Sequence, residues 1–212
     1  MKKTKILALS CSPRNMATEY VAKEALKAAA EFDDRIEVEL YTLRGKKIDP
    51  CNGCGYCKKN KSWCIKKDDM QELFDKMAEA SGILIVTPVY CMTATPQLHA
   101  VASRMRPAMH CFPELLRNKF FSVIAVGGTR NGGQETTIND VIQLFGTRTM
   151  NLVCNENGGY TGGKVWSQDK GPEGAAADEI GMATATKLAA KLAEVCLIYD
   201  LGKEAFKAGE NK

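Results

Sequence analysis

The chain has 212 residues, of which 45% are hydrophobic, and carries a net charge of +4 from 29 basic and 25 acidic side chains. This size and apolar content predict one domain with a full core. The mild net charge argues against nucleic acid as a partner. No apolar run approaches the roughly 20 residues of a membrane span. The apolar stretch Ile6–Leu9 is shorter than the ~7–15 residues of a signal-peptide core, and an odd number of cysteines fits a reducing compartment, so we expect a cytoplasmic protein.

Apolar runs alternate with amphipathic stretches along the first half of the chain. The expected elements are a strand at Lys5–Leu9, a helix at Ala17–Phe32, a strand at Ile36–Thr42, a helix from Asp68 or Asp69 to Ala80, and a strand at Ile83–Thr87. Asp68 or Asp69 is expected to cap its helix, with Gln71 or Glu72 completing a capping box.

The second half continues the alternation. The expected elements are a helix through Leu98, Val101 and Met105 that is interrupted at Pro107, a strand at Phe120–Val126, a helix to about Phe145, a short strand around Met150–Val153, and a last helix at Asp178–Tyr199. Strands that alternate with helices predict an α/β fold, a doubly wound five-stranded parallel sheet with helices on both faces. We expect a single domain over residues 1–212, with a cysteine-rich loop, residues 45–67, inserted after the second strand.

Four cysteines follow the second strand in the pattern C-x2-C-x2-C-x6-C: Cys51, Cys54, Cys57 and Cys64. This spacing brings four thiolates together without help from distant parts of the chain, and four soft anionic ligands around one point are what an iron–sulfur cluster needs. Gly53 and Gly55 allow the chain to curl tightly and turn backbone N–H groups toward sulfur.

Two other uses of these cysteines stay open. Structural zinc takes four cysteines, but usually as two C-x2-C pairs separated by a longer loop. Disulfides need an oxidising compartment, and the short spans here would give strained, reducible bridges. The spacing favours an iron–sulfur cluster, with zinc and free or redox-active thiols as the alternatives.

Between Arg44 and Lys67 the chain has a single acid, Asp49, and eight basic residues: Arg44, Lys46, Lys47, Lys58, Lys59, Lys61, Lys66 and Lys67. A positive rim favours thiolates and offsets the negative charge of a cluster. It would also steer an acidic electron carrier such as a ferredoxin. For any one lysine, a solvated surface position explains its presence equally well.

Three loops follow strands whose carboxyl ends are expected at one edge of the sheet, where open α/β sheets bind ligands. The first, Ser10–Thr18, combines hydroxyls and one guanidinium with a helix N-terminus, which suits a terminal phosphate. It has neither a Walker Gly-Lys-Ser/Thr nor a G-x-G-x-x-G pattern, so a mononucleotide fits better than a dinucleotide. The second, Thr87–Pro96, offers a flat wall for a planar heterocycle. The third, Gly127–Glu135, is rich in glycine and lets backbone approach a ring edge.

Several other residues receive structural or accessory interpretations. His99 and His110 have no acid or nucleophile spaced to form a triad, so we expect structural roles. Trp63 is expected to shield a cluster from water. Tyr160 and Trp166, in the long connection before the last helix, are expected to cover a subunit interface or a substrate.

With these motifs the chain resembles the iron–sulfur flavoproteins of the NADPH-dependent FMN reductase superfamily, a flavodoxin-like group. The motifs that carry the resemblance are Ser-x-Ser-Pro-Arg at 10–14, the cysteine motif at 51–64, Ile-Lys-Lys-Asp-Asp-Met at 65–70, Pro-Val-Tyr at 88–90, residues 127–135 and Asp-Lys-Gly-Pro at 169–172. They span nearly the whole chain in the family's order.

The resemblance implies two cofactors, FMN and a [4Fe–4S] cluster, in a homodimer or homotetramer. It implies that the FMN phosphate binds Ser10, Ser12, Arg14, Asn15 and Thr18. It implies that the isoalloxazine lies against Pro88, Val89, Tyr90, Cys91, Met92, Thr93, Gly128, Thr129, Arg130 and Asn131. It implies that the cluster binds Cys51, Cys54, Cys57 and Cys64.

The function that follows is an electron-transfer flavoprotein, an oxidoreductase that passes electrons from a ferredoxin-like carrier through the cluster to FMN and on to oxygen, peroxide or a quinone. No side chain is expected to act as acid or base, so no catalytic residue is assigned. The first alternative is an NAD(P)H-dependent FMN or quinone reductase with a structural or vestigial cysteine motif. The second is a redox sensor.

Overall fold

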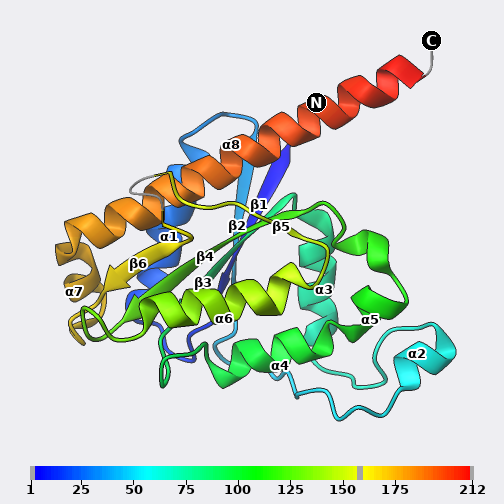
Figure 1. Cartoon of the computed structure of the whole chain (residues 1–212), viewed down its shortest axis with the longest axis horizontal. Helices are drawn as coiled ribbons and strands as arrows, with labels where there is room; N and C mark the ends of the chain where they lie inside the picture. Colours follow the sequence, from blue (N-terminus) through cyan, green and yellow to red (C-terminus); the bar gives the residue numbers. More distant parts are fainter. Residues whose placement is uncertain (1–2, 157–159, 211–212) are drawn as a thin grey trace.

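A parallel sheet occupies the middle of the molecule in the computed structural model, which describes residues 3–156 and 160–210 (Figure 1). Its main path has the order β2-β1-β3-β4-β5. The strands are β1 (Thr4–Ser10), β2 (Ile36–Thr42), β3 (Gly82–Pro88), β4 (Phe120–Gly127) and β5 (Asn151–Leu152). The chain reverses its direction of winding between β1 and β3, so the doubly wound parallel sheet is confirmed.

The fifth strand position is shared by two short strands. β5 pairs with Phe120 and Phe121 of β4, whereas β6 (Gly163–Trp166) pairs with the carboxyl half of β4, Ile124–Gly127. The sequence predicted β5 but treated β6 as part of a glycine-rich connection, because four residues are too few to show an alternating pattern. Gly163 permits this strand to lie close to its neighbours, since a Cβ there would stand 3.0 Å from Ile124 and 3.1 Å from Ala185.

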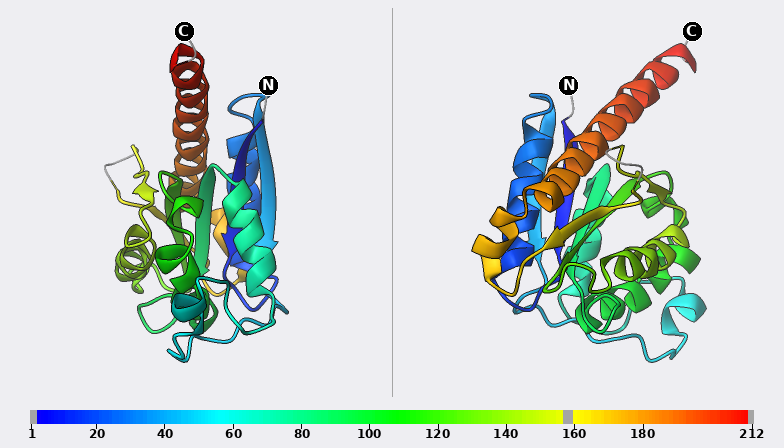
Figure 2. Two further views of the ribbon diagram at one scale, coloured as in Figure 1. Left: turned by 90° about the vertical axis from the view of Figure 1, so that its right-hand side faces the viewer. Right: turned by 60° about the vertical axis from the view of Figure 1, so that its left-hand side comes forward.

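Helices cover both faces of the sheet (Figure 2). They are α1 (Ala17–Ala30), α2 (Tyr56–Asn60), α3 (Met70–Glu79), α4 (Pro96–Arg104), α5 (Arg106–His110), the 3-10 helix η1 (Pro113–Leu115), α6 (Gln134–Gly146), α7 (Gly171–Ala177) and α8 (Glu179–Glu210). The break between α4 and α5 falls at Met105, and Pro107 lies in the first turn of α5, where a missing N–H costs nothing. The predicted interruption was therefore placed slightly late.

Alternation along the strands divides the core in two. Leu7, Leu9 and Ile83 belong to the apolar cluster under α3, α4 and α6, whereas Ile6 and Ala8 belong to the cluster under α1 and α8. Successive strand residues point to opposite faces, so a strand covered on both faces is apolar throughout. The continuous apolar runs in the sequence have this cause.

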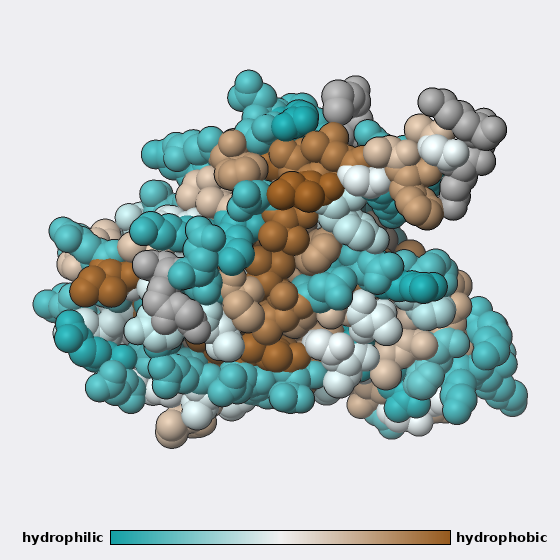
Figure 3. Space-filling view, turned by 45° about the horizontal axis from the view of Figure 1, so that its top comes forward, coloured by the Kyte–Doolittle hydropathy of each residue, from teal (hydrophilic) through white to brown (hydrophobic). Residues whose placement is uncertain are grey.

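The last helix is longer than predicted. α8 ends at Glu210 rather than Tyr199 and projects past the sheet (Figure 1). Its final turns lack the apolar stripe that marks a packed helix, so the helical pattern in the sequence ends early. Figure 3 shows a band of hydrophobic residues across the face that carries α8, and Ile198 and Phe206 are exposed apolar residues of this helix.

The predicted cap at α3 is supplied by Asp68, whose Oδ1 accepts from the Met70 backbone N–H at 3.2 Å. The reciprocal half of the capping box is absent, because Gln71 bonds to Asp75 and Glu72 bonds to Lys46. Asp69 stands at the N-cap but makes no side-chain cap hydrogen bond, and its Oδ2 instead accepts from the Lys47 backbone N–H at 2.6 Å. Asp68 is engaged by Arg104. Both carboxylates therefore hold the cysteine segment that precedes α3. Among the residues described, no helix combines the length and hydropathy that crossing a membrane requires.

Candidate functional site

The loop after β1 presents an uncapped helix N-terminus. Ser10 is fully buried, and its hydroxyl finds no hydrogen-bond partner among the described residues. The Ser12 Oγ accepts from the Arg14 backbone N–H at 3.0 Å, while the Arg14 and Asn15 side chains face solvent. Met16 at the N-cap of α1 supplies no side-chain cap. Two buried hydroxyls and the free N–H groups of a helix therefore lie at the start of α1, the arrangement expected of a phosphate site.

The loop after β3 contains a two-residue turn in a costly backbone conformation. The Tyr90 and Thr93 backbones exchange hydrogen bonds of 2.9 and 3.0 Å, and the two residues between them, Cys91 and Met92, have φ of 49° and 65°. Such a turn strongly prefers glycine or asparagine, because the left-handed region crowds the Cβ atom of other residues. Strain of this kind concentrates at ligand-binding loops.

Met92→Gly is expected to give a protein about 1 kcal/mol more stable than Met92→Ala, since glycine removes the left-handed strain and alanine does not. Met92 is 58% exposed, so both substitutions lose little packing. Urea unfolding of the two variants measures the difference. Equal stabilities would show that the turn is not strained at Met92.

The loop after β4 packs against this turn. Gly133, the N-cap of α6, has φ of 101°, and a Cβ there would lie 2.9 Å from Met92 Cα. The Gln134 side chain fixes the loop, because its Oε1 accepts from Gly132 N–H and its Nε2 donates to the Thr129 carbonyl at 2.7 Å.

Trp166 belongs to the same loop cluster. It lies in β6 rather than in an irregular connection, its Nε1 donates to the Gly128 carbonyl at 2.8 Å, and the Arg130 guanidinium lies 5.0 Å over its ring. Tyr160 lines the same cavity as Trp166 and Arg130, with Lys164 Nζ 3.7 Å over its ring. Trp166 therefore acts as a support for residues 128–130.

The first and second loops are also joined directly. Thr95, the N-cap of α4, donates from Oγ1 to the Cys11 carbonyl at 3.0 Å. Cys11 itself is fully buried, and burial raises the pKa of its thiol, so it remains a neutral packing residue. The three loops predicted from the sequence are consequently continuous along one edge of the sheet.

A polar cluster that the sequence did not reveal stabilises the second loop. Asp140 of α6 accepts from the Ala94 backbone N–H at 3.1 Å and from the Thr93 hydroxyl, and its Oδ2 lies 3.2 Å from His99 Nε2. Sequence spacing offered His99 no acid, because Asp140 is distant in sequence and reaches it through the packing of α6; the structural role expected of His99 is not contradicted by this contact. No sequence signal marks this pair.

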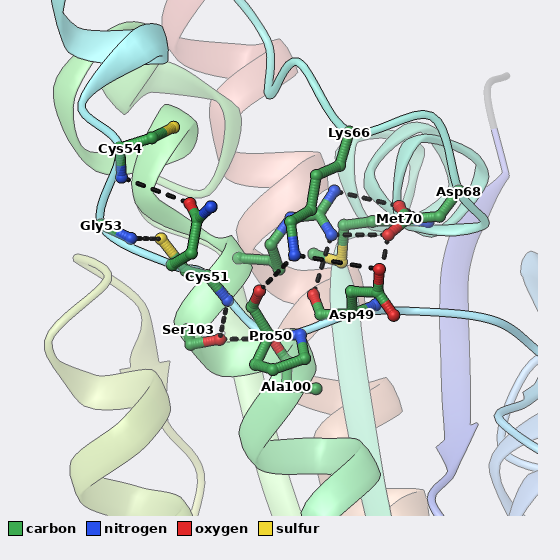
Figure 4. Close-up of polar contacts among 12 residues, drawn as sticks. Asp49, Pro50, Cys51, Gly53, Cys54, Lys66, Asp68, Met70, Ala100 and Ser103 are labelled. Carbon is green, nitrogen blue, oxygen red and sulfur yellow. Dashed lines mark hydrogen bonds and ion pairs between the residues drawn. The ribbon is translucent and has the colours of Figure 1, made fainter.

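The four motif cysteines line one cavity of about 40 Å³, together with Arg104, Arg106 and Pro107. All four are free thiols, and their exposure ranges from Cys57, which is buried, to Cys54, which is exposed. Gly53 and Gly55 both have φ of 73°, and Gly53 N–H points at Cys51 Sγ, 3.4 Å away (Figure 4). The tight curl that the glycines predicted is confirmed.

The four cysteines line this cavity, but their side chains are not arranged around a common centre. Among residues 3–156 and 160–210, no group of three or more His, Cys, Asp or Glu side chains is close enough to hold a metal ion. The structure therefore brings the predicted ligands to one place and leaves their coordination untested.

Residues at the α4–α5 junction anchor the cysteine segment. The Ser103 Oγ accepts from the Cys51 backbone N–H at 3.0 Å, and the Cys111 thiol donates to the Cys57 carbonyl at 3.2 Å. Trp63 stacks on Phe112 with ring centroids 4.5 Å apart. Cys111 is thus part of this support, and Trp63 holds the segment to the core.

The basic rim is smaller than the sequence suggested. Lys46 contacts Glu72 at 2.6 Å, Arg44 contacts Glu19 at 3.5 Å, and Lys66 contacts Asp49 at 3.8 Å. Two of these acids, Glu19 and Glu72, come from other parts of the chain, and Asp49 lies at the start of the cysteine segment. Counting charges along the segment alone therefore overstates the positive charge around the cysteines. Exposed lysines remain on and beside α2 at Lys58, Lys59 and Lys61.

Comparisons with known proteins agree with this geometry. The family model described as NADPH-dependent FMN reductase matches residues 4–156. An iron–sulfur flavoprotein of Archaeoglobus fulgidus is 39% identical over 194 residues, which cover 90% of this chain and 96% of the relative. An iron–sulfur flavoprotein of Methanosarcina thermophila is 33% identical over 192 residues, covering 90% and 94%.

Solved structures support the fold. A flavodoxin, WrbA-like protein from Agrobacterium tumefaciens aligns with a TM-score of 0.64 at 16% identity, covering 92% of this chain and 98% of that one. A flavone reductase aligns with a TM-score of 0.68 at 22% identity, covering 93% and 64%. The three loops and the cysteine segment all fall within the matched family range.

Proposed function

The chain belongs to the NADPH-dependent FMN reductase family, as one of its iron–sulfur flavoproteins, and from this premise we propose that it is an electron-transfer flavoprotein. In this proposal electrons pass from a low-potential, ferredoxin-like carrier, by way of a [4Fe–4S] cluster and FMN, to a small oxidant such as oxygen, peroxide or a quinone. That the chain is a flavin-dependent oxidoreductase follows from the family.

The residues of the three loops fit FMN. The unpartnered Ser10 hydroxyl and the uncapped α1 offer hydrogen bonds to a phosphate. We assign the phosphate to Ser10, Ser12, Arg14, Asn15 and Thr18. Gly128 lets backbone approach closely, since a Cβ there would clash with Asp169 at 2.2 Å. We assign the ring to Pro88–Thr93 and Gly128–Asn131.

The cysteine cavity fits an iron–sulfur cluster by the chemistry of its donors. Cys51, Cys54, Cys57 and Cys64 are soft ligands, and the cavity between them is lined by two arginines and no acidic residue. A bound cluster would exchange single electrons, whereas FMN exchanges one or two. The gathering of all four cysteines around one cavity is the observation that carries the proposal.

Helix α4 connects the two proposed sites. Its N-cap residue Thr95 contacts the phosphate loop through Cys11, and its last residue, Arg104, lines the cysteine cavity. A helix of nine residues is about 13 Å long. The protein thus supplies a short, rigid spacer between the two positions.

The proposed partners follow from exposed surfaces. Lys58, Lys59 and Lys61 stand beside the cysteine segment and suit an acidic carrier. The apolar residues exposed on α8, Ile198 and Phe206, suit contact with a second copy of the chain in a homodimer or homotetramer.

A second candidate is an NAD(P)H-dependent FMN or quinone reductase in which the cysteine motif is structural. The description of the matching family names NADPH, and the described cysteine side chains do not converge on one point. Hydride would then reach the flavin loops directly, and the cysteine cavity would play no part in turnover.

Iron, acid-labile sulfide and FMN measured per subunit on anaerobically purified protein test the proposal. We expect about four iron, four sulfide and one FMN, with a visible spectrum that bleaches with dithionite. FMN without iron after anaerobic reconstitution, together with reduction by NADPH, would favour the second candidate. Absence of both cofactors would refute both.

A further inference from the structure

One buried arginine joins the two ends of the cysteine segment. Arg104, the last residue of α4, has a side chain only 2% exposed, and that of its partner Asp68 is 4% exposed. The guanidinium donates to both carboxylate oxygens, from Nη1 at 2.6 Å and from Nη2 at 2.9 Å. Nη1 also donates to the Asp49 carbonyl at 2.8 Å. Arg104 thereby holds the residues that enter and leave the motif.

Other hydrogen bonds join the same two stretches, residues 49–50 and 66–68, which together form the neck of the cysteine loop (Figure 4). The Asp49 backbone N–H donates to Asp68 Oδ2 at 3.2 Å, and Lys66 Nζ donates to the Pro50 carbonyl at 2.8 Å. Every one of these contacts is made between protein groups alone.

One donor of Arg104 is left over. Its Nε is buried and makes no hydrogen bond within the described residues, although an unpaired buried donor is costly. Arg104 lines the same cavity as the four cysteines. Burial lowers the pKa of the guanidinium, but the hydrogen bond to the Asp68 carboxylate helps to outweigh burial, so the net shift is upward.

We propose that Arg104 is a positioning residue for the cluster: it closes the neck of the cysteine loop, and its free Nε–H, in the wall of the cavity, is available to a cluster sulfur. This inference rests on the proposed function for the presence of the cluster. A hydrogen bond and a fixed positive charge next to the sulfur favour the more negative, reduced state. Arg104 thus raises the reduction potential of the bound cluster.

The chain offers a matched control in Arg106. It lines the same cavity, two positions along, but is only half-buried and has no carboxylate partner among the contacts of the described residues. Replacing Arg104 and Arg106 by lysine removes the planar fork and the Nε–H while keeping the positive charge. Arg104→Gln removes the charge as well.

The first readout needs no cluster. Trypsin is added to iron-free protein, and cleavage after Lys58, Lys59 and Lys61 is followed together with cleavage in α8. We expect cleavage in the cysteine segment, relative to cleavage in α8 of the same protein, to be about tenfold faster in Arg104→Lys and faster still in Arg104→Gln, with FMN binding unchanged. Arg106→Lys is expected to match the wild-type protein. A rate that is unchanged in both Arg104 variants would overturn the closing role.

The second readout is the reduction potential of the reconstituted cluster, which a merely structural role would not move. At a fixed solution potential, the ratio of reduced to oxidised cluster is expected to fall about tenfold in Arg104→Lys, a shift of ~59 mV for one electron. An unchanged potential, or an equal shift in Arg106→Lys, would refute the sulfur contact. If the wild-type protein itself takes up no iron, the proposed function and the sulfur contact both fail, and cleavage still decides whether Arg104 closes the loop.

Discussion

Replacing Cys54 with serine is expected to abolish the cluster while FMN binding is retained. A serine hydroxyl is a harder and far less acidic ligand than a thiol, and it does not replace thiolate on iron under ordinary conditions. The three remaining cysteines leave one iron of the cluster without a protein ligand. We expect iron and sulfide per subunit to fall to background, with FMN remaining near one per subunit.

The position of Cys54 makes this test specific. Cys54 is exposed, and its backbone N–H bonds to the Asn52 side chain at 3.3 Å, so serine fills its place without loss of packing. The proposed flavin loops lie beyond the opposite end of α4. Simultaneous loss of FMN would contradict the separation of the two sites.

Cys154→Ser is the matched control, because Cys154 is also an exposed free thiol but lies outside the motif. It is expected to leave iron, sulfide and FMN unchanged. Loss of iron in this control would mean that the metal is held by thiols in general, and the assignment to Cys51, Cys54, Cys57 and Cys64 would then fail.

The parts of this fold that depend on local sequence were predictable. The strand Ile36–Thr42 agrees at both ends, and β1, β3 and β4 agree to within a residue at each end, because buried parallel strands are apolar throughout. The three loops at the carboxyl edge follow from strand order alone. Gly53 and Gly55 predicted a tight curl of the chain, because glycine tolerates positive φ.

The parts that depend on tertiary packing were not predictable. Asp140 meets His99, and Asp68 meets Arg104, only because α6 and α4 bring these pairs together across 41 and 36 positions of sequence. The left-handed φ of Cys91 and Met92 contradicts the preference of both residue types, so no local rule announces it. β6 escaped detection since its strand character comes from pairing with β4.

The same distinction explains why the cysteine site was found while its support was missed. The spacing of the four cysteines is itself the signal, because the ligands lie within one segment. Ser103, Arg104 and Cys111 come from the α4–α5 junction and contact the segment only in the folded chain. Arg104 in particular looks like an ordinary helix-end cation until its burial is known.

Asp68→Asn is expected to lower the free energy of unfolding at pH 7 by roughly 3–5 kcal/mol, since it leaves the buried Arg104 charge without its counter-ion. Asp68 accepts two bonds from Arg104 and one each from the Asp49 and Met70 backbone N–H groups. Asparagine can replace only part of this set. Urea unfolding of the FMN-bound, iron-free protein measures the loss without interference from the cluster.

The pH dependence of this loss identifies its cause. Burial raises the pKa of Asp68, but the hydrogen bonds from Arg104, Asp49 and Met70 outweigh burial and hold the pKa below its ordinary value. A carboxyl with a lowered pKa in the folded state contributes its full stability above the pKa of the unfolded state, about 3.9, and loses it as the pH falls through the folded value. The difference in unfolding free energy between wild type and Asp68→Asn should therefore be constant near neutral pH and shrink below about pH 4.

Asp33→Asn is the control, because Asp33 makes a similar two-bond ion pair with Arg35, at 2.7 and 2.8 Å, in an exposed position where solvent screens the pair. We expect little change in this control, and an equal loss in both variants would show that burial of the Asp68–Arg104 pair is not what makes it important.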